Sequence, residues 1–128
     1  MSAMHVELVS VERALWSGDA TGVYARSLEG ELGILPGHTP LLAALEPGWI
    51  VRIERADEAE LRVAVHGGFL SVREDGVSVL AEMAELADDI DTARARAALD
   101  RAGSDADGDA AAARDRALAR LRAAGESV

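Results

Sequence analysis

The chain has 128 residues, a formal net charge of −10 and no cysteine. Its length suits one domain with room for a sizeable aliphatic core, and the missing cysteines exclude disulfide scaffolds and cysteine metal sites. The acidic balance argues against general nucleic-acid binding, because that binding depends on Lys and Arg to neutralise phosphates.

Short strands are predicted from Met4 to about Ala84. Segments 5–11, 21–27, 48–54, 60–66, 68–74 and 76–82 are short and mostly rich in β-branched residues. Turn-forming residues separate many of them, at 17–19, 47–48, 56–58, 67–68 and 74–76. Many short strands at this spacing favour a β-sandwich or a flattened barrel.

The stretch "GELGILPGHTPLLAAL", residues 30–45, contains three glycines and two prolines between apolar residues. Such residues are typical of turns, so we expect one sandwich strand to bend here into a loop and back. Leu41, Leu42 and Leu45 are expected to return the chain to the core.

Two helices are predicted after about residue 88. Segment 88–102 consists mainly of strong helix formers, with Asp89 or Asp91 available as N-cap. The cluster "GSDADGD", 103–109, should interrupt the helix, and a second helix is expected over 110–124. The expected organisation is therefore a β-sandwich domain at 1–87 and a helical hairpin at 88–128. Leu99, Leu118 and Leu121 give that hairpin a thin apolar face, so we expect it to need a partner, a ligand or the sandwich to hold its position.

The histidines do not form a recognisable catalytic or metal-binding pattern. His5, His38 and His66 are each expected to be a turn or surface residue, since nothing in their spacing shows that they converge with carboxylates. No nucleophile arrangement or phosphate-binding glycine loop is present either. The sequence therefore shows no catalytic constellation, and an enzyme is the interpretation that it favours least.

Charge is distributed unevenly along the chain. Residues 1–90 hold 16 acidic residues and six arginines, whereas 91–128 hold seven of each. Arg94 and Arg101 lie seven residues apart and so on one helix face, where they could bind phosphates or form a solvated surface. The second helix carries four arginines that could fold back onto the acidic sandwich, reach an acidic surface elsewhere or remain solvated: Arg114, Arg116, Arg120 and Arg122.

Four segments together carry a resemblance to a known family. "EGELGILPGHTPLLAALEPG", "HGGFLSV", "VSVLAEMAE" and "IDTARA" resemble, in order and spacing, the epsilon subunit of F-type ATP synthases. The resemblance runs from about Val6 to Arg101 and weakens in the second helix. It implies an N-terminal β-sandwich followed by a C-terminal two-helix hairpin.

The resemblance implies a rotor part at the cytoplasmic face of the cell membrane, held there through the complex. Family members bind the gamma subunit through the sandwich and rest on the ring of c subunits, so that proton-driven rotation reaches the catalytic head. The loop facing the ring would contain Glu29, Glu31 and His38. Carboxylates there could pair with basic or polar c-subunit loops.

In the family the hairpin either folds beside the sandwich or extends along gamma toward the alpha and beta subunits, where it inhibits ATP hydrolysis. The folded form of several bacterial members binds ATP through an [IL]-D-x-x-R-A motif. The resemblance thus implies no required cofactor, but ATP as a regulatory ligand. An ATP-binding sensor, whose output is the hairpin's conformation, is the rival interpretation. The residues that match the motif or fall at matching positions are Glu85, Ile90, Asp91, Arg94, Ala95 and Arg101.

Overall fold

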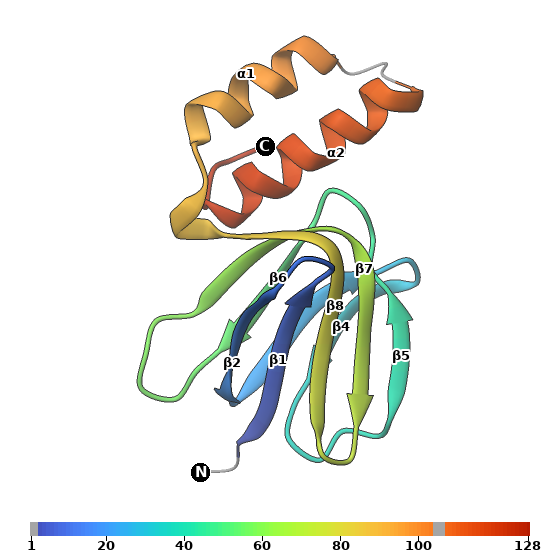
Figure 1. Cartoon of the computed structure of the whole chain (residues 1–128), viewed down its shortest axis with the longest axis vertical. Coiled ribbons are helices and arrows are strands. Elements are labelled where there is room, and N and C mark those ends of the chain that lie inside the picture. The colour runs from blue at the N-terminus through green and yellow to red at the C-terminus, as the bar shows by residue number, and fades with distance from the viewer. Residues whose placement is uncertain (1–2, 104–106) are drawn as a thin grey trace.

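The computed structural model describes residues 3–103 and 107–128, which form eight strands, one short 3₁₀ helix and two α-helices (Figure 1). The strands are β1 (Met4–Ser10), β2 (Ala14–Ala20), β3 (Gly22–Ser27), β4 (Gly30–Ile34), β5 (Leu41–Ala44), β6 (Ile50–Glu54), β7 (Leu61–Arg73) and β8 (Gly76–Leu86). The helices are η1 (Ala87–Asp89), α1 (Thr92–Ala102) and α2 (Gly108–Ala123).

One hydrogen-bonded sheet builds the sandwich. Its strand order is β2-β1-β8-β7-β6-β3-β4, and β5 pairs separately with β7. The first part of β7 pairs with β6 and its last part with β5, so this long strand contributes to both halves of the sandwich. The helical hairpin lies across one end of the sandwich, and the N-terminus lies at the other end (Figure 1). The predicted fold class, a β-sandwich followed by a two-helix hairpin, is confirmed.

The prediction of a turn at Gly67 and Gly68 is wrong, because both residues lie inside β7. Its pairing with β8 keeps one register from Val63 opposite Leu86 to Arg73 opposite Gly76. Gly67 has a φ of +76°, and a Cβ on Gly68 would lie 2.4 Å from the carbonyl oxygen of Leu80. These glycines therefore permit an unusual backbone path and a close approach of β8 within a continuous strand.

The prediction of a turn at 17–19 is also wrong, because these residues belong to β2. The chain reverses between β1 and β2 instead, where the amide of Ser10 donates to the carbonyl of Arg13 at 2.9 Å. Gly18 is needed for packing, since a Cβ there would lie 2.8 Å from the Trp16 ring. The predicted turns at 47–48, at 56–58 and at the β7–β8 connection lie outside the strands, apart from Gly76.

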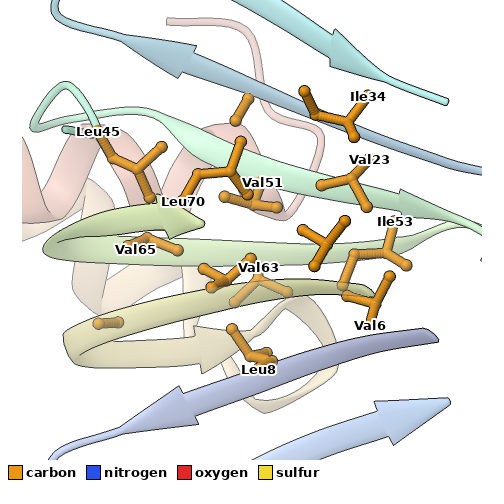
Figure 2. Packing of buried hydrophobic residues seen from close by; sticks show 14 of the residues in the cluster. Val6, Leu8, Val23, Ile34, Leu45, Val51, Ile53, Val63, Val65 and Leu70 are labelled. Carbon is orange, nitrogen blue, oxygen red and sulfur yellow. The ribbon is translucent and has the colours of Figure 1, made fainter. Parts of the chain in front are cut away.

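The core is aliphatic and fills the space between the layers of the sandwich (Figure 2). Along β7, Val63 and Val65 belong to this core, whereas Ala64 and His66 face outward on the alternate positions. Leu45 is buried as predicted and Leu41 packs against the core. Leu42 is 68% exposed, which contradicts the prediction that it returns to the core. Neighbouring residues of a strand point to opposite faces, so Leu41 and Leu42 cannot both point inward.

The hairpin packs on the outward face of β7. Ala64 on β7 forms a buried cluster with Ala119 and Ala123 of α2, and Ile50 and Ile90 pack against it. Side chains this small let the helix come close to the strand. Leu118 and Leu121 are buried, as the sequence predicts. The predicted helix-breaking segment 103–109 lies partly outside the described residues, and α2 begins at Gly108, two residues earlier than expected.

Gly68→Ala should destabilise the protein by about 1–3 kcal/mol, because its methyl group would meet the rigid backbone of β8. Gly33→Ala is a matched control, since the added Cβ lies in a strand at ordinary contact distance, 3.4 Å from the Tyr24 ring. Urea unfolding of both variants measures the difference. Equal free energies of unfolding for Gly68→Ala and Gly33→Ala would contradict the close approach.

Candidate functional site

The N-terminus of α1 is set by a side-chain cap. The Oδ1 atom of Asp91 accepts a hydrogen bond from the backbone amide of Arg94 at 3.0 Å. This cap satisfies one of the amides that a first helical turn leaves unpaired. Of the two predicted N-caps, Asp91 is therefore the one used by α1, whereas Asp89 lies in η1.

A hollow of about 450 Å³ opens between the end of β8 and the two helices. Five of the six residues that the resemblance assigns to an ATP site line it, and only Ile90 does not. Ile90 instead packs against the cluster of Ala64, Ala119 and Ala123. The hollow is lined by Glu85, Asp89, Asp91, Arg94, Ala95, Ala98, Arg101, Ala113, Arg116 and Arg120.

The charges in this hollow come from different elements. Arg94 and Arg101 come from α1, and Arg116 and Arg120 come from α2. The sequence did not decide which arginines of the second helix would join such a site. Arg116 and Arg120 are four residues apart and share a helix face, which is the signal that could have selected them. The four guanidinium groups offer donors to an anionic ligand, but three carboxylates line the same hollow, those of Glu85, Asp89 and Asp91.

Arg122 lies on another side of α2 and belongs to a different contact. Its guanidinium carbon lies 3.8 Å from the centroid of the Trp49 ring, which Arg26 approaches at 4.4 Å. It also donates to the carbonyl of Gly48. Arg122 therefore helps to hold the hairpin against the sandwich through a cation–π contact.

Glu85 connects the hollow to the sheet. Its Oε1 atom accepts from Arg120 Nε at 2.7 Å and from His66 Nε2 at 2.9 Å. Burial alone would raise the pKa of Glu85, but the hydrogen bonds from Arg120 and His66 outweigh it and lower that pKa below its ordinary value. Glu85 is therefore a carboxylate that ties β8 both to β7 and to α2.

The expectation that each histidine is a turn or surface residue holds for two of the three. His5 is half-exposed on β1, and His38 lies exposed in the loop after β4. His66 differs, because its side chain is only 6% exposed. It lies on the outward face of β7, which α2 covers from more than forty residues away in the sequence. No local signal in the sequence could have shown this burial.

The three residues predicted to face a c-subunit ring do not lie on one loop. Glu29 lies in the turn between β3 and β4, and Glu31 lies within β4, where it is 3.7 Å from Arg26. His38 lies beyond the other end of β4, in a loop that borders the β7–β8 turn, and its Nδ1 is 2.6 Å from the carbonyl oxygen of Thr39. A surface that included all three would have to run the length of β4.

Within residues 3–103 and 107–128, no cluster of three or more His, Asp or Glu side chains could hold a metal ion. In the same part of the chain, no helix is both long enough and apolar enough to cross a membrane. The described residues therefore offer neither a metal site nor a membrane-spanning helix in addition to the hollow.

Sequence comparison identifies the family. The family model "ATP synthase, Delta/Epsilon chain, beta-sandwich domain" matches residues 3–87. The ATP synthase epsilon chain of Streptomyces griseus is 53% identical, over 94% of this chain and 94% of its own. That of Thermobifida fusca is 56% identical, over 94% of this chain and 91% of its own. That of Mycolicibacterium vanbaalenii is 51% identical, over 98% of each chain.

Solved structures share the fold. A chain in the cryo-EM structure of the Euglena gracilis mitochondrial ATP synthase, OSCP/F1/c-ring, superimposes with a TM-score of 0.76 at 22% identity, covering 98% of this chain and 81% of that chain. A chain in the Tetrahymena thermophila mitochondrial ATP synthase central stalk/c-ring gives 0.61 at 19% identity, covering 94% and 90%. The sequence matches, together with this fold, show that the chain belongs to the family of ATP synthase epsilon chains, non-catalytic components of the central stalk.

Proposed function

We propose that this chain is a rotor subunit that couples rotation of the c-subunit ring, through the gamma subunit, to ATP synthesis. Its place would be peripheral, at the cytoplasmic face of the cell membrane, where the ring's loops can be reached. The hairpin adds regulation, because it can leave the sandwich and extend toward the alpha and beta subunits to inhibit ATP hydrolysis. Membership of the epsilon family and an exposed apolar surface on the sandwich support this proposal.

The proposed contact with the gamma subunit rests on one observation, an apolar strip across β5, β7 and β8. Phe69 pairs directly with Ala44 on one side and with Leu80 on the other, so their side chains share one face of the sheet. Phe69 and Leu80 are 50% and 47% exposed, and Leu42, two residues from Ala44, lies on the same face. Apolar groups gathered on a surface favour burial by a partner. In the proposal, gamma covers this strip.

The contact with the ring would involve Glu29, Glu31 and His38. Glu29 and Glu31 present carboxylates at one end of β4, and His38 presents an imidazole beyond its other end. Carboxylates at such a contact set the register between partners and their rate of association more than their affinity. The ring would therefore contact a long, polar edge of the sandwich.

ATP, in the proposal, stabilises the folded hairpin. Arg94 and Arg101 meet Arg116 and Arg120 around one hollow only because the two helices are packed together. A ligand held by both helices binds the folded conformer more tightly than the extended one, and this difference in affinity shifts the population without hydrolysis. The same hollow supports the rival function, an ATP sensor whose output is the hairpin's conformation.

Arg94→Ala should weaken ATP binding to the isolated chain at least tenfold, because it removes a guanidinium group that lines the hollow. Arg96→Ala is a matched control, since Arg96 lies outside the hollow and pairs with Glu126 at 3.7 Å. Isothermal titration calorimetry with ATP measures both. If the chain without substitutions gives no heat, the ATP ligand and the sensor interpretation are both removed, and equal affinity in the two variants would remove Arg94 from the ATP site.

Phe69→Asp should abolish or strongly weaken binding to gamma, because it places a charge in the middle of the apolar strip. Leu35→Asp is the control, since Leu35 is similarly exposed, at 53%, but lies in the loop after β4. The measurement is reconstitution of an epsilon-depleted ATP synthase, with the amount of chain retained and the ATPase rate as readouts. If the chain without substitutions neither binds gamma nor alters the ATPase rate, the rotor proposal is refuted.

Glu31→Arg should lower proton-driven ATP synthesis several-fold while leaving the fold intact. Glu31 is exposed and its contact with Arg26 is long, so its loss costs little stability. Glu12→Arg makes the same charge change on the connection between β1 and β2 and serves as control. The rate of ATP synthesis in reconstituted vesicles is measured for both. Equal rates in the two variants would count against a ring contact at Glu31.

A further inference from the structure

His66 lies on β7 where α2 covers the sandwich. Its side chain is only 6% exposed, and its Nε2 atom lies 2.9 Å from Glu85 Oε1. Glu85 in turn accepts from Arg120 of α2 at 2.7 Å. A chain of three side chains therefore runs from β7 through β8 to the docked helix.

The proton on His66 is placed by this contact. An ionised Glu85 can only accept, so the neutral imidazole must carry its proton on Nε2, and Nδ1 is left as an acceptor. Nδ1 is buried and has no hydrogen-bond partner among the described residues. A second proton would create a buried N–H donor at Nδ1 that nothing in these residues accepts, which is costly in the docked state.

The charges around His66 come from two elements. Glu85 lies beside it on β8, and Arg120 and Arg116 approach from α2. Glu82 of β8 and Asp115 of α2 line a second, separate hollow of about 380 Å³, which His66 and Arg116 also border. Burial lowers the pKa of His66 below its ordinary value, and although Glu85 opposes this, the cations of Arg120 and Arg116 add to the decrease.

We propose that His66 is a proton-sensing residue that releases the helical hairpin from the sandwich when the pH falls. This inference rests on the part of the proposed function in which the hairpin can leave the sandwich. Release exposes the outward face of β7 and opens the buried Nδ1 atom to water, which can accept its proton, while Glu85 stays beside Nε2 on the neighbouring strand β8. The proton thus binds the released form in preference to the docked form, and mass action shifts the population toward release.

The direction and the pH window follow from linkage. A histidine whose pKa is lowered on docking favours docking above its ordinary pKa of about 6.5, and this contribution is lost as the pH falls through 6.5 toward the lowered value. The pKa of Glu85 is also lowered, so protonation of this carboxylate weakens docking only when the pH falls below 4.5, the ordinary pKa of the group. The two titrations therefore act in separate windows.

Trp49 offers a readout of docking, since Arg122 of α2 stacks on its ring at 3.8 Å only while the hairpin is in place. A Trp16→Phe background leaves Trp49 as the sole tryptophan. Ala119→Glu, which puts a charge into the buried alanine contact, provides the reference signal of the released hairpin. His66→Gln is the test variant, because its amide can still donate to Glu85 but does not titrate.

Between pH 7.5 and 5.5 the ratio of released to docked chain should rise by about two- to tenfold, tenfold being the limit if the docked form binds no proton. In His66→Gln the ratio should stay constant, although His5 and His38 are still present. An NMR titration of the His66 imidazole in the unchanged chain is a second measurement that needs no variant, and its pKa should lie below about 6.5.

Equal pH responses in the unchanged chain and His66→Gln would overturn the inference, as would a His66 pKa at or above about 6.5. If Ala119→Glu alters the Trp49 signal but pH does not, the hairpin can be released and only the proton-sensing role fails. If the pH response is present but the chain does not bind gamma, the proposed rotor function fails and the inference about His66 stands.

Discussion

The docking of α2 on the outward face of β7 is the interaction on which the rest of the site depends. Ala64, Ala119 and Ala123 have too little side chain to keep helix and strand apart, so Arg120 comes within 2.7 Å of Glu85. The burial of His66 and the pairing of Glu85 with Arg120 exist only in this arrangement, while the arginine-lined hollow also needs α1 packed against α2. The candidate ligand site and the candidate proton sensor therefore share one contact.

The docking contact is built from weak parts. Alanines bury little apolar area, so the hydrophobic free energy of this contact is small compared with that of the sandwich core. The ion pair of Glu85 and Arg120 is about a quarter exposed, and solvent screens part of its attraction. A contact of this strength can be shifted by one ligand or one proton, whereas the valine- and leucine-rich core cannot. In the proposed function, the sandwich is thus the stable base and the hairpin the movable part.

Sequence patterns predicted the architecture because its signals are local. Alternating β-branched residues marked the strands, and the change to helix formers near residue 88 marked the hairpin. The two wrongly predicted turns lie where a glycine serves packing inside a strand instead of a chain reversal. Gly67 and Gly68 suggested a turn, but they permit a close approach inside β7, and Gly18 makes room for Trp16 inside β2. A glycine's neighbours in space, which the sequence does not show, decide between the two.

The sequence could predict those residues of the candidate site whose positions depend on their neighbours along the chain. Asp91, Arg94 and Arg101 follow from helix capping and helical spacing, and the resemblance added Glu85. The helix face shared with Arg120 could select Arg116, but the contact of that face with the sheet and the burial of His66 could not be predicted, because both depend on α2 packing over β7, a contact between segments more than forty residues apart. The same dependence makes these residues informative about function. In the proposed release of the hairpin, His66 loses its burial and Arg116 moves away from it, so these two residues can report or control that movement, while residues placed by local structure, such as Asp91, cannot.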